Sequence, residues 1–193
     1  MLFSDTHQGN LLKAFQAFLF CILFFYRRPY LVLVSLLPAS LRAYQMTQTL
    51  ATPCWMEAAV VLIRVFLFFL IIANLSNSYP QVLRDKAFWE RLSHDASKLM
   101  ASTWPKLLIA QLIVFIFCLY GLMNLLILAV VDLSLSTVMR WFSTADNDPE
   151  AFANAYVFFL KNMSVIPLSM VYMLKMLGVG VNNTALMPPR ELS

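Results

Sequence analysis

Residues 107–131 read LLIAQLIVFIFCLYGLMNLLILAVV and contain no charged side chain. At a rise of about 1.5 Å per residue, a helix of this length crosses a hydrocarbon core of about 30 Å with some tilt to spare. Lys106 and Asp132 bracket the run, and Trp104 and Pro105 precede it. An aromatic residue and a proline are typical of the point where a membrane helix begins. The stretch therefore predicts a transmembrane helix.

The composition of the whole chain extends this prediction beyond one helix. Of the 193 residues, 61% are hydrophobic and 12% are charged, with a mean hydropathy of +0.72. A soluble domain has about 25% charged residues, and it could not cover so much apolar surface with so few charges. We predict an all-α, polytopic transmembrane protein with about four spans and an amphipathic interfacial helix. Residues 1–193 are expected to form a single integral membrane domain.

Two more apolar stretches predict spans on either side of this run. Residues 53–75 form one, and Arg64 lies inside it. Residues 153–180 form the last, although Lys161 and Lys175 interrupt it. Pro167 is expected to kink this last helix without breaking it, because neighbouring groups in a membrane protein can satisfy the freed backbone.

The N-terminal third allows two interpretations. Residues 14–26 are very apolar, but about a dozen residues are too few to span, and Arg27, Arg28 and Pro29 end the stretch. In the preferred interpretation this stretch lies on the membrane surface and Pro29 begins a span over residues 29–50. In the other, the two apolar stretches form a short hairpin that does not fully cross.

Residues 81–103 predict the amphipathic interfacial helix. Lys86 and Glu90, like Arg91 and Asp95, are spaced for ion pairs along a polar face. The apolar positions recur on one stripe: Leu83, Phe88, Leu92, Ala96 and Leu99. We expect this helix to lie at the membrane boundary or against a partner.

The distribution of basic residues predicts an orientation. Residues 77–106 contain Arg84, Lys86, Arg91, Lys98 and Lys106, whereas residues 132–150 contain only Arg140. The positive-inside rule places the first segment in the cytoplasm or the equivalent compartment. With four spans, the C-terminus then also faces the cytoplasmic side. We expect a bacterial inner (plasma) membrane or an organelle inner membrane.

The sequence contains no recognisable catalytic or cofactor pattern. His7 and His94 belong to no metal-binding pair, and Cys21, Cys54 and Cys118 form no CxxC motif. No GxSxG motif, glycine-rich phosphate loop or basic nucleic-acid-binding arm is present. We therefore expect no enzymatic activity, no cofactor or metal, and no nucleic-acid partner.

Arg64 is the strongest candidate for a functional residue. A charged residue at mid-bilayer costs about 2.5–3.5 kcal/mol on insertion scales. Glu57 lies too far along the same helix for direct pairing, and the neighbours one turn away offer no acceptor: Val60, Val61, Leu67 and Phe68. We predict an intramembrane contact with a partner subunit or a polar cavity. The alternative is that Arg64 extends to a lipid headgroup. Lys161 and Lys175 are weaker candidates for the same kind of contact.

These features favour a non-enzymatic subunit of a larger multiprotein membrane complex, with an assembly, scaffold or accessory role. Secretion, conjugation and respiratory machineries are examples. Its expected partners are membrane lipids and other integral membrane subunits. The alternative is a component of a transporter for an anionic substrate, with Arg64, Lys161 or Lys175 lining the path. The lack of an acidic residue or histidine deep in the spans counts against a self-contained transporter. A lipid-modifying enzyme is a third possibility, without a recognisable catalytic set.

Overall fold

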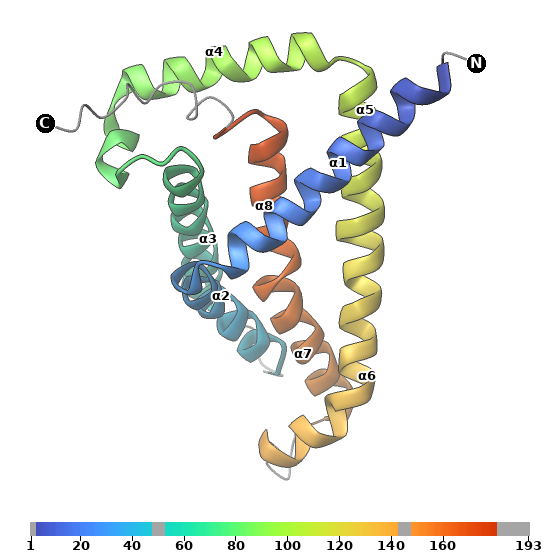
Figure 1. Cartoon of the computed structure of the whole chain (residues 1–193). Coiled ribbons are helices and arrows are strands. Elements are labelled where there is room, and N and C mark those ends of the chain that lie inside the picture. The colour runs from blue at the N-terminus through green and yellow to red at the C-terminus, as the bar shows by residue number, and fades with distance from the viewer. Residues whose placement is uncertain (1–2, 48–52, 143–147, 181–193) are drawn as a thin grey trace, which may run out of the picture.

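A computed structural model describes residues 3–47, 53–142 and 148–180, and within these ranges the chain is helical and has no strand (Figure 1). The expected all-α polytopic architecture is confirmed, because four helices are long and apolar enough to cross a membrane. The elements are α1 (Phe3–Tyr26), α2 (Pro29–Thr47), α3 (Cys54–Leu75), η1 (Pro80–Arg84), α4 (Lys86–Thr103), α5 (Lys106–Val114), the π-helical η2 (Phe115–Leu122), α6 (Met123–Phe142), α7 (Pro149–Met163) and α8 (Val165–Met176).

The four helices that are long and apolar enough to cross a membrane are Gly9–Tyr26, Cys54–Leu75, Lys106–Trp141 and Pro149–Met176. The last three include most of the predicted spans 53–75, 107–131 and 153–180. The third is longer than expected, because the helix continues beyond Asp132. In Figure 1, the α5–α6 helix runs most of the length of the molecule, and α1 crosses the view obliquely in front of α8.

The N-terminal third differs from the preferred interpretation. Helix α1 begins at Phe3, so its apolar part is longer than a dozen residues, and Gly9–Tyr26 is long and apolar enough to span. The expectation that this stretch is too short is therefore wrong. Helix α2, which was expected to span over residues 29–50, is not among the four helices. It ends at Thr47, and residues 48–50 lie outside the described residues.

Helix α2 nevertheless packs antiparallel to α3. Near the start of α2, the Tyr30 hydroxyl donates a hydrogen bond to the Asn74 side chain at the end of α3. Further along α2, Arg42 pairs with Glu57 near the start of α3. These contacts hold α2 at the depth of the spanning helix beside it, although its composition alone does not identify it as a span.

Helix α4 has the amphipathic character that the sequence predicts, and Figure 1 shows it lying across the ends of the long helices. Asp85 caps it, because its side chain accepts a hydrogen bond from the Ala87 backbone N–H at 3.0 Å. The predicted apolar stripe is partly buried. Lys86 and Glu90 form the expected ion pair at 3.3 Å, whereas Arg91 and Asp95 form none in the described part of the chain.

The main core lies where α1, α3, α5 and α8 meet. Tyr172 is completely buried there, stacks on Phe115 with 5.6 Å between ring centroids, and donates a hydrogen bond to the Gln111 carbonyl at 3.0 Å. The outward faces of the spans remain apolar and open: Leu62 is 67% exposed and Phe117 is 72% exposed. Lipid or partner helices must cover these faces.

Two of the spanning helices are irregular near their middle. The α5–α6 helix contains the π-helical segment η2. The last span is interrupted at Ser164, where the backbone leaves helical geometry between α7 and α8. Pro167 explains this interruption, because proline cannot donate a hydrogen bond to the carbonyl four residues earlier. The Leu160 carbonyl accepts both the Ser164 backbone N–H at 3.0 Å and the Ser164 hydroxyl at 2.6 Å.

Candidate functional site

A cleft of about 600 Å³ lies between α2, α3, the η2–α6 segment and the kinked α7–α8 helix. Arg42, Arg64 and Lys161 all line it, together with the amides of Asn124 and Asn162. We call it the cationic cleft. It is assembled from segments that lie far apart in the sequence.

Arg64, Asn124 and Lys161 come from the middle of their helices, whereas Arg42 lies towards the end of α2 and pairs with Glu57 near the start of α3. Arg64 stands near the midpoint of α3, about 15 Å from either end at about 1.5 Å per residue. Asn124 is central in the Lys106–Trp141 helix, and Lys161 is central in the Pro149–Met176 helix. This part of the site therefore lies at the middle of the candidate spans, where a charged group in a membrane lacks water.

Arg64 finds its hydrogen-bond partner on another helix. Its Nη2 donates to Oδ1 of Asn162 on α7. Asn162 is only 3% exposed, and its own Nδ2 donates to the Phe158 carbonyl at 2.7 Å. A neutral amide satisfies one donor of Arg64 but leaves its charge unbalanced. Nε of Arg64 and Oδ1 of Asn124 are buried and have no hydrogen-bond partner among the described residues.

Glu57 is engaged by Arg42 and not by Arg64. The Arg42 guanidinium donates to both carboxylate oxygens, at 2.6 and 2.8 Å, and a further hydrogen bond reaches Gln45 at 2.9 Å. A two-pronged pair of this kind fixes the orientation of both groups. It also ties α2 to α3 at the edge of the cationic cleft.

The charges of the site do not balance. Arg42 pairs with Glu57, whereas Arg64 and Lys161 form no ion pair with any described residue. The cationic cleft therefore has an excess of positive charge in a region of low dielectric constant. Such a site attracts an anionic group more strongly than the same charges would in water.

The mouth of the cationic cleft is apolar. Tyr120, Phe158 and Met173 line it and are 54%, 40% and 47% exposed. Tyr120 and Phe158 stand in the middle part of their candidate spans, whereas Met173 lies close to the end of the Pro149–Met176 helix. The opening is therefore bordered by partly exposed aromatic and apolar side chains.

Of the candidates from the sequence, the structure brings together Arg64 and Lys161 but not Lys175. The Lys175 ammonium instead lies 4.7 Å from the centre of the Phe20 ring on α1, in a cation–π contact. Sequence reasoning missed Arg42 and Asn162. Asn162 could have been noticed, because an amide within an apolar span requires a hydrogen-bond partner.

The chemistry of the cationic cleft is that of anion recognition. In the described residues, no group of three or more His, Cys, Asp or Glu side chains is placed to hold a metal ion. Comparisons with protein-family models, curated proteins and solved structures give no match. The function is therefore inferred from the cleft itself.

Proposed function

We propose that this chain is a non-enzymatic subunit of a larger membrane complex, and that its cationic cleft receives an acidic side chain from a transmembrane helix of a partner. The observation that carries the proposal is the unbalanced positive charge of Arg64 and Lys161 at mid-membrane depth.

The energetic argument starts from the cost of an isolated charge. A lysine or arginine at mid-bilayer costs about 2.5–3.5 kcal/mol on insertion scales. Asn162 offers Arg64 an acceptor but no negative charge. An aspartate or glutamate on a neighbouring helix carries a similar cost of its own. When the cation and the carboxylate pair, their attraction offsets the insertion cost of both charges, and this favours association of the helices.

The surroundings of the cleft favour an occupant that is itself embedded in the membrane. A water-soluble anion would have to pass the apolar mouth formed by Tyr120, Phe158 and Met173. A lipid headgroup lies about 15 Å away, because the hydrocarbon core is about 30 Å thick. A partner helix reaches this depth without leaving the membrane, and the exposed apolar faces provide surface for it to pack against.

One observation favours the alternative, a component of a transporter for an anionic substrate. The π-helical η2 and the interruption at Ser164 both border the cationic cleft. Interrupted helices at mid-membrane depth are typical of transporter binding sites, and π-helical segments are frequent at functional sites.

The decisive experiment is purification from the native membrane in a mild detergent, followed by measurement of the mass and composition of the isolated particle. The wild-type chain should co-purify with partner subunits at fixed stoichiometry. Lys161→Gln should lower partner retention at least about tenfold, since about 1.4 kcal/mol corresponds to tenfold in affinity. Lys161 forms no ion pair within the described part of the chain, so this change should leave the fold intact.

Lys98→Gln is the matched control, because it removes a cation from the exposed face of α4, away from the cleft. A wild-type chain that purifies alone and moves an anion across liposomes would establish the transport alternative. A stable complex that survives both Lys161→Gln and Arg64→Gln would show that partners dock elsewhere.

A further inference from the structure

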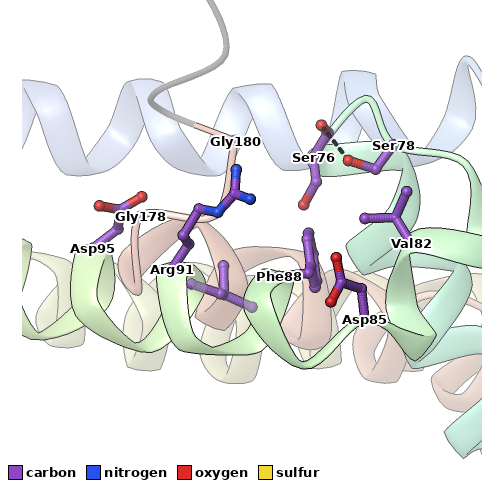
Figure 2. A pocket seen from close by; sticks show the side chains of 10 residues that line it. Ser76, Ser78, Val82, Asp85, Phe88, Arg91, Asp95, Gly178 and Gly180 are labelled. Atoms are coloured by element: carbon purple, nitrogen blue, oxygen red, sulfur yellow. Dashed lines mark hydrogen bonds between the residues drawn. The ribbon is translucent and has the colours of Figure 1, made fainter. Parts of the chain in front are cut away.

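A second cavity, of about 220 Å³, lies between the end of α3, η1, α4 and the turn after α8 (Figure 2). We call it the interfacial pocket. Its polar lining consists of Ser76, Ser78, Asp85, Arg91 and Asp95. It does not share a lining residue with the cationic cleft.

The position of the interfacial pocket is that of lipid headgroups. The spanning helix α3 ends at Leu75, the next span begins at Lys106, and α4 lies across this end of the molecule (Figure 1). The pocket opens between the end of a span and an amphipathic helix. Such helices lie at the boundary between headgroups and acyl chains.

The pocket presents opposite charges that do not neutralise each other. Figure 2 shows the Arg91 side chain rising from α4, with Phe88 and Asp85 on one side and Asp95 on the other. Arg91 forms no ion pair with any described residue. Asp85 uses one carboxylate oxygen to cap α4, so its other oxygen can accept a hydrogen bond from a ligand.

The turn after α8 forms a further wall of the pocket, and it contains two glycines. Gly178 and Gly180 have φ angles of 80° and 82°, in the left-handed region that side chains disfavour. A Cβ atom at Gly180 would collide with the Leu75 carbonyl oxygen. The buried side chain of Val179 anchors the turn between them. The pocket is therefore preformed, which lowers the entropic cost of binding.

We propose that the interfacial pocket binds the phosphoethanolamine headgroup of a zwitterionic phospholipid. The Arg91 guanidinium matches the phosphate, and the Asp85 carboxylate beside the Phe88 ring matches the ammonium. An anionic headgroup without an amine would face both Asp85 and Asp95, with Arg91 as the only cation among the described lining residues. The volume is below the roughly 300–1,000 Å³ of sites for drug-sized ligands, and it suits a headgroup.

The number of aromatic rings that line the pocket indicates that it selects ethanolamine over choline. Quaternary ammonium groups are recognised by cages of several aromatic rings, whereas Phe88 is the only ring among the described lining residues. Carboxylates favour a primary ammonium, because it donates hydrogen bonds and a trimethylammonium does not.

The test is native mass spectrometry of the full chain after reconstitution in an equimolar mixture of phosphatidylethanolamine, phosphatidylcholine and phosphatidylglycerol with identical acyl chains. The wild type should retain phosphatidylethanolamine preferentially. Arg91→Gln and Asp85→Asn should each reduce this preference by about tenfold, because hydrogen bonds to charged groups contribute about 1.5–3 kcal/mol. Asparagine caps helices about as well as aspartate, so Asp85→Asn should leave α4 folded.

Matched controls come from the same helix. Lys98→Gln and Glu90→Gln remove a cation and an anion outside the pocket lining and should keep the wild-type preference. Equal retention of the three lipids by the wild type would overturn the proposal. A preference for phosphatidylethanolamine that survives both pocket variants would also overturn it, and so would a preference for phosphatidylglycerol. Failure of the cationic cleft to bind a partner would leave this test unaffected.

Discussion

Asn162 of α7 accepts a hydrogen bond from Arg64 of α3 at the centre of the helix bundle, and it is the neighbour of Lys161 in the sequence. The residue that holds Arg64 in place thus stands beside a second cation of the same cleft. This arrangement holds Arg64 and neutralises the charge of neither cation. It also provides a single position from which the charge of the site can be changed with little change in shape.

Asn162→Asp should therefore separate assembly from stability. A carboxylate at this position pairs with Arg64 inside the chain, so the purified protein should gain thermal stability. The same change lowers the excess positive charge, so retention of the partner should fall. Melting temperature in detergent and co-purification from native membranes measure the two effects.

Asn162→Ala serves as the comparison. It removes the hydrogen bond to Arg64 and should destabilise the chain by about 1–3 kcal/mol, because a buried donor loses its partner. Since the cleft keeps its charge, partner retention should fall less than with Asn162→Asp. An aspartate variant that binds its partner as well as the wild type would contradict an electrostatic docking site.

The pair between Arg42 and Glu57 predicts a stabilising link between α2 and α3. Their side chains are 23% and 46% exposed, so partial solvent screening reduces their attraction. Glu57→Gln should cost about 1–2 kcal/mol of unfolding free energy, less than the about 3–5 kcal/mol for breaking a fully buried pair. The double exchange Arg42→Glu with Glu57→Arg should recover part of this loss in a thermal unfolding assay.

The pair between Lys86 and Glu90 on α4 is the control for this measurement. Its side chains are 91% and 65% exposed, and Glu90→Gln should change stability by less than about 0.5 kcal/mol. Equal losses for Glu57→Gln and Glu90→Gln would show that the pair at the cleft contributes no more than an exposed pair.

The helices were predictable from the sequence where the pattern of apolar residues is uninterrupted. Residues 107–131 are uncharged throughout, and the stripe from Phe88 to Leu99 has a clear helical period, so both elements follow from local pattern. The N-terminal helix was misjudged because Gly9, Asn10 and Lys13 interrupt the hydropathy but not the helix. Backbone hydrogen bonds continue a helix through polar residues. A length estimated by counting apolar residues leaves those residues out.

The site was only half predictable, for a different reason. The cost of a charge in a span identified Arg64 and Lys161 without any knowledge of packing. Lys161 lies near the middle of the last span, whereas Lys175 stands next to its end, about 21 Å further along the helix. Only one of them can be level with Arg64, and the choice depends on where the span begins and ends, which the interrupted apolar pattern leaves open. Arg42 was overlooked because the sequence shows only that it lies in α2. Its place in the cleft depends on how α2 packs against α3, and this packing is a tertiary property.

Tyr172 links the core to the π-helical segment. The contribution of its hydroxyl to the free energy of unfolding can be measured separately from that of its ring. Tyr172→Phe keeps the stack on Phe115 but loses the hydrogen bond to the Gln111 carbonyl. It should cost about 1 kcal/mol, whereas Tyr172→Ala should cost about 3–5 kcal/mol by leaving a cavity. Thermal unfolding of both variants tests this. Indistinguishable losses would mean that the ring contributes little beyond its hydroxyl.

Helix α4 and the start of α3 lie at opposite ends of the helix bundle. An impermeant thiol reagent should therefore reach them from opposite sides of the membrane. Cys54 is exposed at the start of α3, and Ser97→Cys would place a thiol on the exposed face of α4. If α4 is cytoplasmic, the reagent should label position 97 in inverted vesicles and Cys54 in intact cells. Cys54→Ala identifies its signal. Labelling of both positions from one side would contradict the arrangement of the spans.

The turn after α8 predicts the largest effect of a single methyl group in this chain. A Cβ at Gly180 meets the Leu75 carbonyl oxygen, which is backbone and cannot rotate away. The positive φ adds strain, so Gly180→Ala should destabilise the protein by about 1–3 kcal/mol. Gly178→Ala meets a flexible leucine side chain at 2.7 Å and should cost less. Gly9→Ala, with nothing within 4 Å of the added atom, should be neutral or slightly stabilising because alanine favours helix. Melting temperatures that do not follow this order would show that the end of α8 is not clamped between α3 and α4.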